Sequence, residues 1–358
     1  MNKPLIDHPR LAFLRHPAAH FAAASLSPAV FLLIGAVFGG FWALFGFLWI
    51  TLFLSIADRL GRRFGKDRAA PEADIWLERL PLALGLLHFP MLLFAVFALT
   101  GGTGLGLGSW VLSFLGFGLW FGQVSNSTAH ELIHRTDRWS FRLGMWIYIS
   151  LLFGHHTSAH RLVHHRFAAT ADDPNTAQAG ESFYAFLVRA WPGGFIAGYE
   201  MEKARQDGRP AWLQPYTVYL AGAAGFVLII AAGFGIDGFL AYLLLCAHTQ
   251  VQLLLSDYVQ HYGLERQETG LDSYEPFGPA HSWDAPDLFS GLMMLHAPRH
   301  ADHHLHPARP YTALELSPGG KAPLLPFSLP AMATLALIPY FWHRIMDRRL
   351  NTWKRQNS

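Results

Sequence analysis

Three clusters of histidines in this sequence have the spacing of metal ligands. They are His130 and His134, then His160, His164 and His165, and then His300, His303 and His304. On a helix, positions i, i+3 and i+4 share a face, so we expect the rings of each cluster to aim their nitrogens at one point. Neutral imidazole binds iron, zinc, copper or nickel. Three such faces that meet predict a metal site with room for more than one ion.

The number of imidazoles favours two metal ions over one. The eight histidines of the clusters are more than one tetrahedral zinc ion can use, and we expect two iron ions. Residues 130–134 alone also match the H-E-x-x-H signature of a membrane zinc metalloprotease, with Glu131 as the general base, but that reading leaves two clusters unexplained. A metal transporter is a further alternative. It would need polar ligands deep inside the apolar segments, and residues 80–129 have almost none.

The composition places these clusters beside a membrane. The chain of 358 residues is 52% hydrophobic and only 15% charged, and residues 16–57 and 80–130 contain no Asp, Glu, Lys or Arg. A helix needs about 20 apolar residues to cross a bilayer, so each run is long enough for two spans, and residues 216–259 add two more. The sequence therefore predicts an all-α integral membrane protein with six transmembrane helices and a cytoplasmic helical cap. No cleavage site closes the first run, which we expect to remain as an anchor.

Basic residues predict the orientation of these spans. The loop at 58–68 is strongly positive, so the positive-inside rule places it in the cytoplasm, with the turns at Gly39-Gly40, 101–108 and Asp237 outside. Every histidine cluster then lies on the cytoplasmic side of the membrane. The expected regions are a cytoplasmic tail at 1–20, four spans at 21–134, a cap at 135–215, two spans at 216–262 and a cytoplasmic C-terminal region at 263–358.

Two further apolar stretches are not expected to cross the membrane. Residues 143–153 are too short, and we expect a buried or surface-lying helix there. Four prolines interrupt residues 322–343, which favours a helix along the inner surface that ends in Arg344, Arg348 and Arg349.

Several other partners and cofactors are excluded. A net charge of +2 is too small to suggest binding to nucleic acid, and the lone Cys246 can form neither an internal disulfide nor a cysteine-held metal cluster. The glycines at 104–108 miss the G-x-G-x-x-G spacing, so we expect no flavin or nucleotide on this chain. Electrons, if the reaction needs them, must then come from a separate carrier, which we expect to dock at the cytoplasmic face. A basic surface for it is predicted at Arg59, Arg62, Arg63, Arg135, Arg138 and Arg142.

Carboxylates and aromatic residues near the clusters suggest supporting roles. We expect carboxylates to accept hydrogen bonds from the ring N–H groups of the ligands, and the candidates are Glu131, Asp302, Asp173 and Asp257. A hydrophobic substrate would need an apolar channel from the bilayer to the metals. Candidate channel residues are Trp42, Trp49, Trp120 and Phe121.

Taken together, the motifs resemble those of the bacterial membrane alkane 1-monooxygenases. The resemblance rests on residues 130–135, on 160–165 followed by Asp173-Pro174, on 258–264 and on 299–307, and it covers the chain from about 129 to 311. Membrane fatty-acid desaturases and xylene-type hydroxylases share the histidine clusters, whereas His261-Tyr262-Gly263-Leu264 favours the hydroxylases. The sequence departs from the pattern at Ala159, Val163 and Gln260, where glutamate, glycine and glutamate are common.

The resemblance implies a non-haem diiron enzyme that inserts one oxygen atom of O2 into the terminal methyl group of a medium-length alkane. Electrons would pass from NAD(P)H through a reductase and a rubredoxin-type carrier. A desaturase or an aryl-methyl hydroxylase with the same metal site is the alternative. The implied ligands are His130, His134, His160, His164, His165, His261, His300, His303 and His304.

Overall fold

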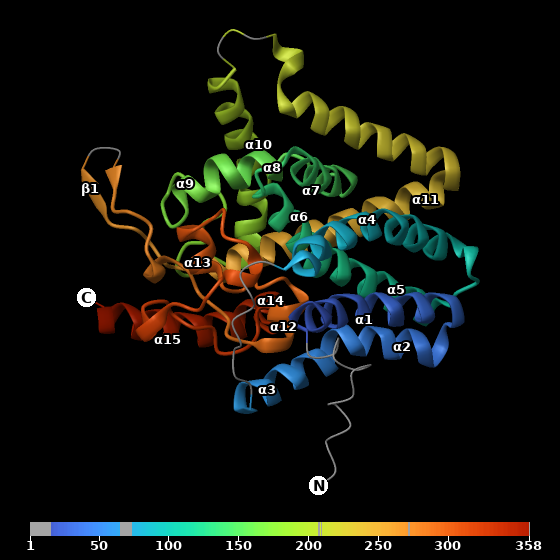
Figure 1. Cartoon of the computed structure of the whole chain (residues 1–358), viewed down its shortest axis with the longest axis horizontal. Coiled ribbons are helices and arrows are strands. Elements are labelled where there is room, and N and C mark those ends of the chain that lie inside the picture. Colours follow the sequence, from blue (N-terminus) through green and yellow to red (C-terminus); the bar gives the residue numbers. More distant parts are fainter. Residues whose placement is uncertain (1–15, 65–73, 207, 209, 271–272, 358) are drawn as a thin grey trace.

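The computed structural model describes residues 16–64, 74–206, 208, 210–270 and 273–357, and this part of the chain is mostly helical (Figure 1). Most of the expected tail at 1–20 and part of the basic loop at 58–68 therefore lie outside the described residues. A short antiparallel ribbon, β1 (Glu268–Gly270) and β2 (Ser273–Tyr274), extends from one side.

Five helices in the described part of the chain are long and apolar enough to cross a membrane, as the uncharged runs predict. The first and last are α1 (Pro17–Phe38) and α11 (Pro215–His261). Between them lie Gly40–Arg62, which contains α2 (Gly40–Leu48) and most of α3 (Leu54–Phe64), Ile75–Gly102, which begins with α4 (Ile75–Phe97), and Leu107–Ile133, which contains α5 (Leu107–Trp120) and α6 (Asn126–Ile133). The protein is thus a multi-pass membrane protein. The first hairpin turns at Gly39, whose φ of 61° suits glycine.

The helix α11 has 47 residues and is bent within its length. Gly235, with φ 66° and ψ −160°, interrupts the helical backbone, so α11 supplies two apolar arms. The sequence predicts this turn at Asp237, and the structure places it two residues earlier, because glycine adopts a positive φ without steric cost. The count of six crossings treats the two arms separately and remains a prediction.

The remaining helices form a cap at one end of the apolar helices. The short helix expected at 143–153 forms as α7, which begins five residues earlier because Asp137 caps its first turn. The α-helical and π-helical elements of the cap are α7 (Arg138–Ser150), α8 (His156–Ser158), a π-helical turn (Ala159–His164), α9 (His165–Phe167), α10 (Phe183–Ala204), α12 (Leu288–Met293), α13 (His300–Leu305), α14 (Leu329–Ala336) and α15 (Pro339–Asn357).

The C-terminal region differs from the expected surface helix. Pro330 and Pro339 lie in the first turns of α14 and α15, where proline is tolerated, so they start helices and do not break them. The helix α15 continues past the three arginines to Asn357. The indole of Trp342 is fully buried against Tyr258 at the end of α11, which fixes α15 to the cap.

Close packing of α1 on α2 yields a stability prediction. A Cβ atom built on Gly46 would lie 2.7 Å from the carbonyl oxygen of Phe31, a backbone atom that cannot rotate away. We expect Gly46→Ala to lower the free energy of unfolding by about 1–3 kcal/mol. Thermal unfolding in detergent measures this effect. Gly225→Ala in α11 is the matched control, because nothing lies within 4 Å of its Cβ; equal melting temperatures for the two variants would contradict the prediction.

Candidate metal centre

All nine histidines implied by the sequence come together in the cap, in two adjoining groups. The first group is His130, His134, His160, His165 and His303, and the second is His164, His261, His300 and His304. In each group the candidate ligand atoms lie within 4.8 Å of one another. The groups touch, since the rings of His165 and His304 are 4.6 Å apart.

Different elements position these side chains. His130 lies on α6 (Asn126–Ile133) and His134 at its end, while His261 is the last residue of α11. The second cluster lies on the π-helical turn and the first residue of α9, and the third lies on α13. The metal centre therefore forms where the ends of two apolar helices meet two segments of the cap. The sequence predicts that both of these helix ends face the cytoplasm.

The π-helical turn separates His160 from His164, which corrects the expectation that this pair shares one point. In a π-helix the hydrogen bonds join residues five apart, and such turns are frequent at functional sites. The Nε2 atoms of His160 and His165 accordingly approach to 3.0 Å, whereas His164 turns to the second group. The third cluster also divides. His303 joins the first group, and His300 and His304, one α-helical turn apart, join the second.

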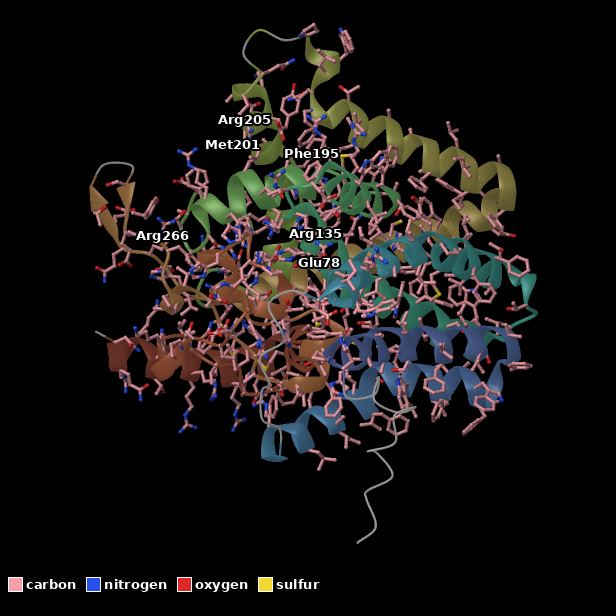
Figure 2. The ribbon with its side chains drawn as sticks, viewed as in Figure 1. Glu78, Arg135, Phe195, Met201, Arg205 and Arg266 are labelled. Atoms are coloured by element: carbon pink, nitrogen blue, oxygen red, sulfur yellow. The ribbon has the colours of Figure 1, made fainter. Side chains whose placement is uncertain are left out.

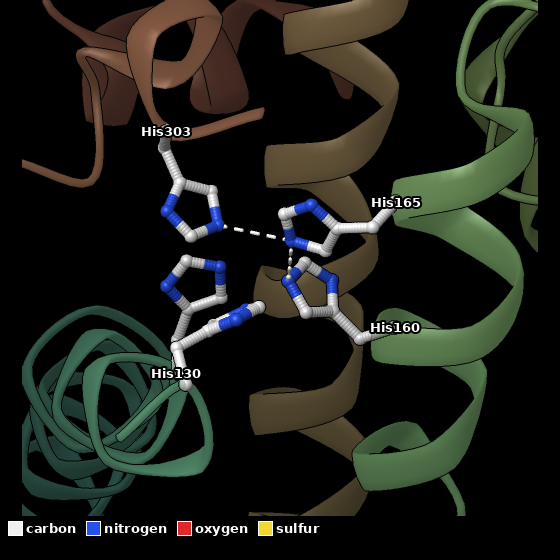
Figure 3. A group of neighbouring side chains, drawn as sticks. His130, His160, His165 and His303 are labelled. Carbon is white, nitrogen blue, oxygen red and sulfur yellow. Dashed lines mark hydrogen bonds between the residues drawn. The ribbon is translucent and has the colours of Figure 1, made fainter. Parts of the chain in front are cut away.

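Ring nitrogens converge in each group in a way that a metal ion would explain. In the first, Nε2 of His165 lies 3.0 Å from Nε2 of His160 and 3.1 Å from Nε2 of His303 (Figure 3). In the second, Nε2 of His300 lies 3.2 Å from Nε2 of His261 and 3.0 Å from Nε2 of His304. A neutral imidazole has one donor and one acceptor nitrogen, so three converging nitrogens cannot all be satisfied by each other.

Burial keeps most of these rings neutral, which is the form that binds metals. Removal from water lowers the pKa of His160, His165 and His303 well below the usual value, and the neighbouring imidazoles lower it further. Nε2 of His134 and Nε2 of His164 are buried and have no hydrogen-bond partner in the described structure. Since buried polar atoms normally have partners, the donor set fits metal ions in both groups.

Two histidines of the second group are oriented by hydrogen bonds at the nitrogen that faces away from the group. Nδ1 of His164 lies 2.8 Å from a carboxylate oxygen of Asp173. Burial lowers the pKa of His164, but the charge and hydrogen bond of Asp173 outweigh that effect and raise it. Nδ1 of His261 lies 3.2 Å from the carbonyl oxygen of His281, to which it can donate. Both contacts leave Nε2 directed into the group, as is usual for metal ligands.

The hydrogen bonds of Glu131 and Asp302 in the described structure go to residues outside the nine histidines, and their expected role as acceptors for the ligand rings remains a prediction. Glu131 accepts hydrogen bonds from Arg135 and from the backbone N–H of Tyr311. Asp302 is held by Arg309 and His306, with contacts of 2.8 and 2.9 Å. Both carboxylates are next to histidines in the sequence but lie on another face of their helices. Their hydrogen bonds join segments of the cap to each other. Asp257 accepts a hydrogen bond from the side chain of Asn175.

Asp284 is a supporting residue that the sequence analysis missed. Its carboxylate accepts a hydrogen bond of 2.9 Å from the backbone N–H of Ala301, in the first turn of α13, and so holds the helix that carries the third cluster. Burial raises the pKa of Asp284 to about 7. No local pattern reveals this contact, because Asp284 lies outside the helices and 17 residues before Ala301 in the chain.

A small cavity of about 30 Å³ lies between the two groups. His130 and His160 of the first group, His300 of the second and the carboxylate of Asp257 all line it. The expected channel residues lie elsewhere. Trp120 and Phe121 are fully buried, with Phe121 packed on His88, whereas Trp42 is 44% exposed on α2 and Trp49 donates a hydrogen bond to Ser27. Their role in a channel remains a prediction.

Among the expected docking arginines whose side chains the structure describes, two are held by hydrogen bonds within the protein. Arg62 forms a paired contact with both carboxylate oxygens of Asp287, and Arg135 donates to Glu131 and to the carbonyl oxygen of Glu78, beside which it lies in Figure 2. The side chain of Arg63 lies outside the described residues. The other three are exposed: Arg59, Arg138 and Arg142.

From these observations the protein belongs to the class of multi-pass membrane proteins with a metal site lined by histidines. Residues 105–317, which include every histidine of both groups, match the fatty acid desaturase family. The chain is 31% identical to an alkane 1-monooxygenase of Ectopseudomonas oleovorans over 330 residues, 87% of this chain and 80% of that protein. It belongs to the fatty acid desaturase family and, within it, to the alkane 1-monooxygenases, which are oxidoreductases.

Two further relatives define the range of the similarity. An alkane 1-monooxygenase of Acinetobacter baylyi is 34% identical over 233 residues, 63% of this chain and 56% of that protein. A xylene/toluene monooxygenase hydroxylase component of Pseudomonas putida is 26% identical over 340 residues, 90% of this chain and 86% of that protein.

Proposed function

We propose that this protein hydroxylates the terminal methyl group of medium-chain alkanes to 1-alkanols, with O2 and two iron ions held by the nine histidines. Electrons would come from a rubredoxin-type carrier and its NAD(P)H-dependent reductase. The observation that carries the proposal is the division of the histidines into groups of five and four around two adjoining points. The identity to relatives named alkane 1-monooxygenases supports the substrate class.

Iron bound in these groups would supply the reductive activation of O2 that attack on an unactivated C–H bond requires. The residues of the chain hold and shield that chemistry. Asp173 and the carbonyl group of His281 orient His164 and His261, and burial keeps the ligands neutral and excludes bulk water. A saturated methyl group offers neither charge nor a hydrogen bond, so an apolar path must position it by shape.

We place the metal centre on the cytoplasmic side of a bacterial inner membrane. The basic residues of α3, which follow the first hairpin, support this orientation under the positive-inside rule. The same topology places the ends of α6 and α11 on that side, where His130, His134 and His261 lie. A reporter fused after α15 tests it. Reporter activity specific to the cytoplasm is expected, and activity specific to the periplasm would contradict the orientation.

The substrate class is tested with membranes that contain the protein, a reducing system and one of three substrates, octane, xylene or a fatty acyl chain. We expect 1-octanol as the main product and about two iron ions per chain. The same membranes without reductant are the control. A new double bond in the acyl chain would assign the protein to the desaturases, and preferred oxidation of the xylene methyl would assign it to the aryl-methyl hydroxylases. One zinc ion per chain would favour the protease alternative.

A further inference from the structure

A groove of about 820 Å³ runs along α15 on the surface of the cap. Leu324 and Phe341 give it apolar walls, and both are substantially exposed. Arg344, Arg348 and Arg349 line the same groove. We call this feature the α15 groove. A surface that combines exposed apolar side chains with one sign of charge is typical of sites that bind a partner.

The positive charge of the α15 groove is not neutralised within the described structure. All three arginines are exposed, and no described carboxylate forms an ion pair with any of them. Burial and the positive charge of Arg62 lower the pKa of Arg349, which shows that cations lie close together here. Asp347, the acidic residue of α15, accepts a hydrogen bond from the hydroxyl group of Tyr262 instead. The groove therefore favours an acidic partner.

The floor of the α15 groove connects directly to the metal centre. The indole of Trp283 lines the groove and donates a hydrogen bond of 2.9 Å to the carbonyl oxygen of Tyr262, which follows the ligand His261. The next residue, Asp284, holds the first turn of α13 beside His300. Two routes thus lead from Trp283 to ligands of the second group, and each contains one hydrogen bond, to Tyr262 beside His261 or from Ala301 beside His300 to Asp284.

We propose that the α15 groove is the docking site of an acidic one-electron carrier protein, and that electrons enter the metal centre through Trp283 and the backbone beside His261. The proposal rests on the proposed function and names the surface for its partner. Each hydroxylation combines substrate, O2, two electrons and two protons to give the alcohol and water. A one-electron carrier must therefore dock twice per turnover, which suits a weak, charge-guided interface.

The position of the groove favours a protein partner over a lipid headgroup. In Figure 1, α15 runs from the centre of the molecule to the C-terminus on the left, whereas α1, α2 and α5 extend to the right. The arginines at 348 and 349 lie in the middle of α15, beyond the apolar turn at its start. The cationic part of the groove thus lies farther along α15, toward its C-terminal end, than the apolar first turn.

The test measures binding of a purified acidic rubredoxin to the protein in nanodiscs of neutral phosphatidylcholine, so the result does not depend on turnover. We expect the double variant Arg344→Glu, Arg348→Glu to weaken binding at least about 10-fold at low salt. The difference should largely disappear in about 0.5 M salt, where surface charges are screened. The matched control, Arg138→Glu with Arg142→Glu, makes the same change of charge on the other exposed basic surface, and we expect it to bind like the wild type.

A second measurement separates docking from catalysis. With rubredoxin as the electron source, the α15 variant should show a raised KM for rubredoxin, while its iron content and its product yield with dithionite should match the wild type. The proposal would be overturned if the Arg138 and Arg142 variant lost more rubredoxin binding than the Arg344 and Arg348 variant. It would also be overturned if both variants bound rubredoxin like the wild type. A different outcome would assign the groove to lipid. In that case anionic phospholipid would copurify with the wild type but not with the α15 variant, and rubredoxin binding would be unchanged. Absence of 1-octanol with either reductant contradicts the proposed function alone.

Discussion

Replacement of His165 by alanine is expected to reduce the iron content from about two to about one per chain and to reduce 1-octanol formation more than about 100-fold. The Nε2 atom of His165 is central in the first group, since it approaches both His160 and His303. Changes to residues that only orient a ligand already cost about 10–100-fold in metal affinity or activity, so loss of the ligand itself should cost at least as much. The second group retains all of its histidines and should still bind one ion.

Elemental analysis of purified protein gives the iron content, and chromatography of the extracted alcohol gives the activity. His20→Ala is the control, because it removes an exposed imidazole that belongs to neither group. Its iron content should match the wild type. If His165→Ala retained two iron ions per chain, His165 would not be a ligand. The proposal that the groups of five and four histidines each bind one ion would then be contradicted.

Asp173→Asn is expected to weaken iron binding in the second group by about 10–100-fold. The carboxylate of Asp173 is fully buried and accepts a hydrogen bond from Nδ1 of His164, which directs Nε2 of that ring to the metal. It also accepts from the hydroxyl group of Thr176. An amide keeps the shape but loses the negative charge, so the ring of His164 is held less firmly.

Competition with a graded series of chelators measures this loss separately from activity, because one of the two ions should leave at lower chelator strength. Asp172→Asn is the matched control, since the neighbouring Asp172 is exposed and its side chain has no role at the ring. The melting temperature in detergent before iron removal shows whether the loop at 173–176 remains folded. Identical chelator profiles for the two variants would show that Asp173 has no influence on the metal.

The departures from the family pattern have a structural explanation at one position. Gln260, where a glutamate is common among the resembling sequences, donates to the carbonyl oxygen of Ala297 and accepts from the hydroxyl group of Ser256. The amide serves as donor and acceptor at once, which an ionised carboxylate cannot do. The residue lines the small cavity between the histidine groups and brings no charge to it.

Local sequence patterns were sufficient to predict the helices and the composition of the metal centre. Uncharged runs predicted the apolar helices, because hydrocarbon accepts only segments that satisfy their own backbone hydrogen bonds. Glycine at position 39 predicted the first turn, and the spacing of the histidines identified eight candidate ligands directly. These features depend on residues close together in the chain, where composition and period determine the outcome.

Only the tertiary structure determined how the ligands divide and what supports them. The π-helical turn moves His164 away from His160, and the contacts of Asp173 with His164, of His281 with His261 and of Asp284 with α13 join segments that no period relates. The sequence alone determined that this chain carries imidazoles in number and spacing for metal binding at the ends of membrane helices. Their assignment to two points depended on packing between distant segments, because the direction of a side chain depends on the local helix type and on neighbours that the spacing does not specify.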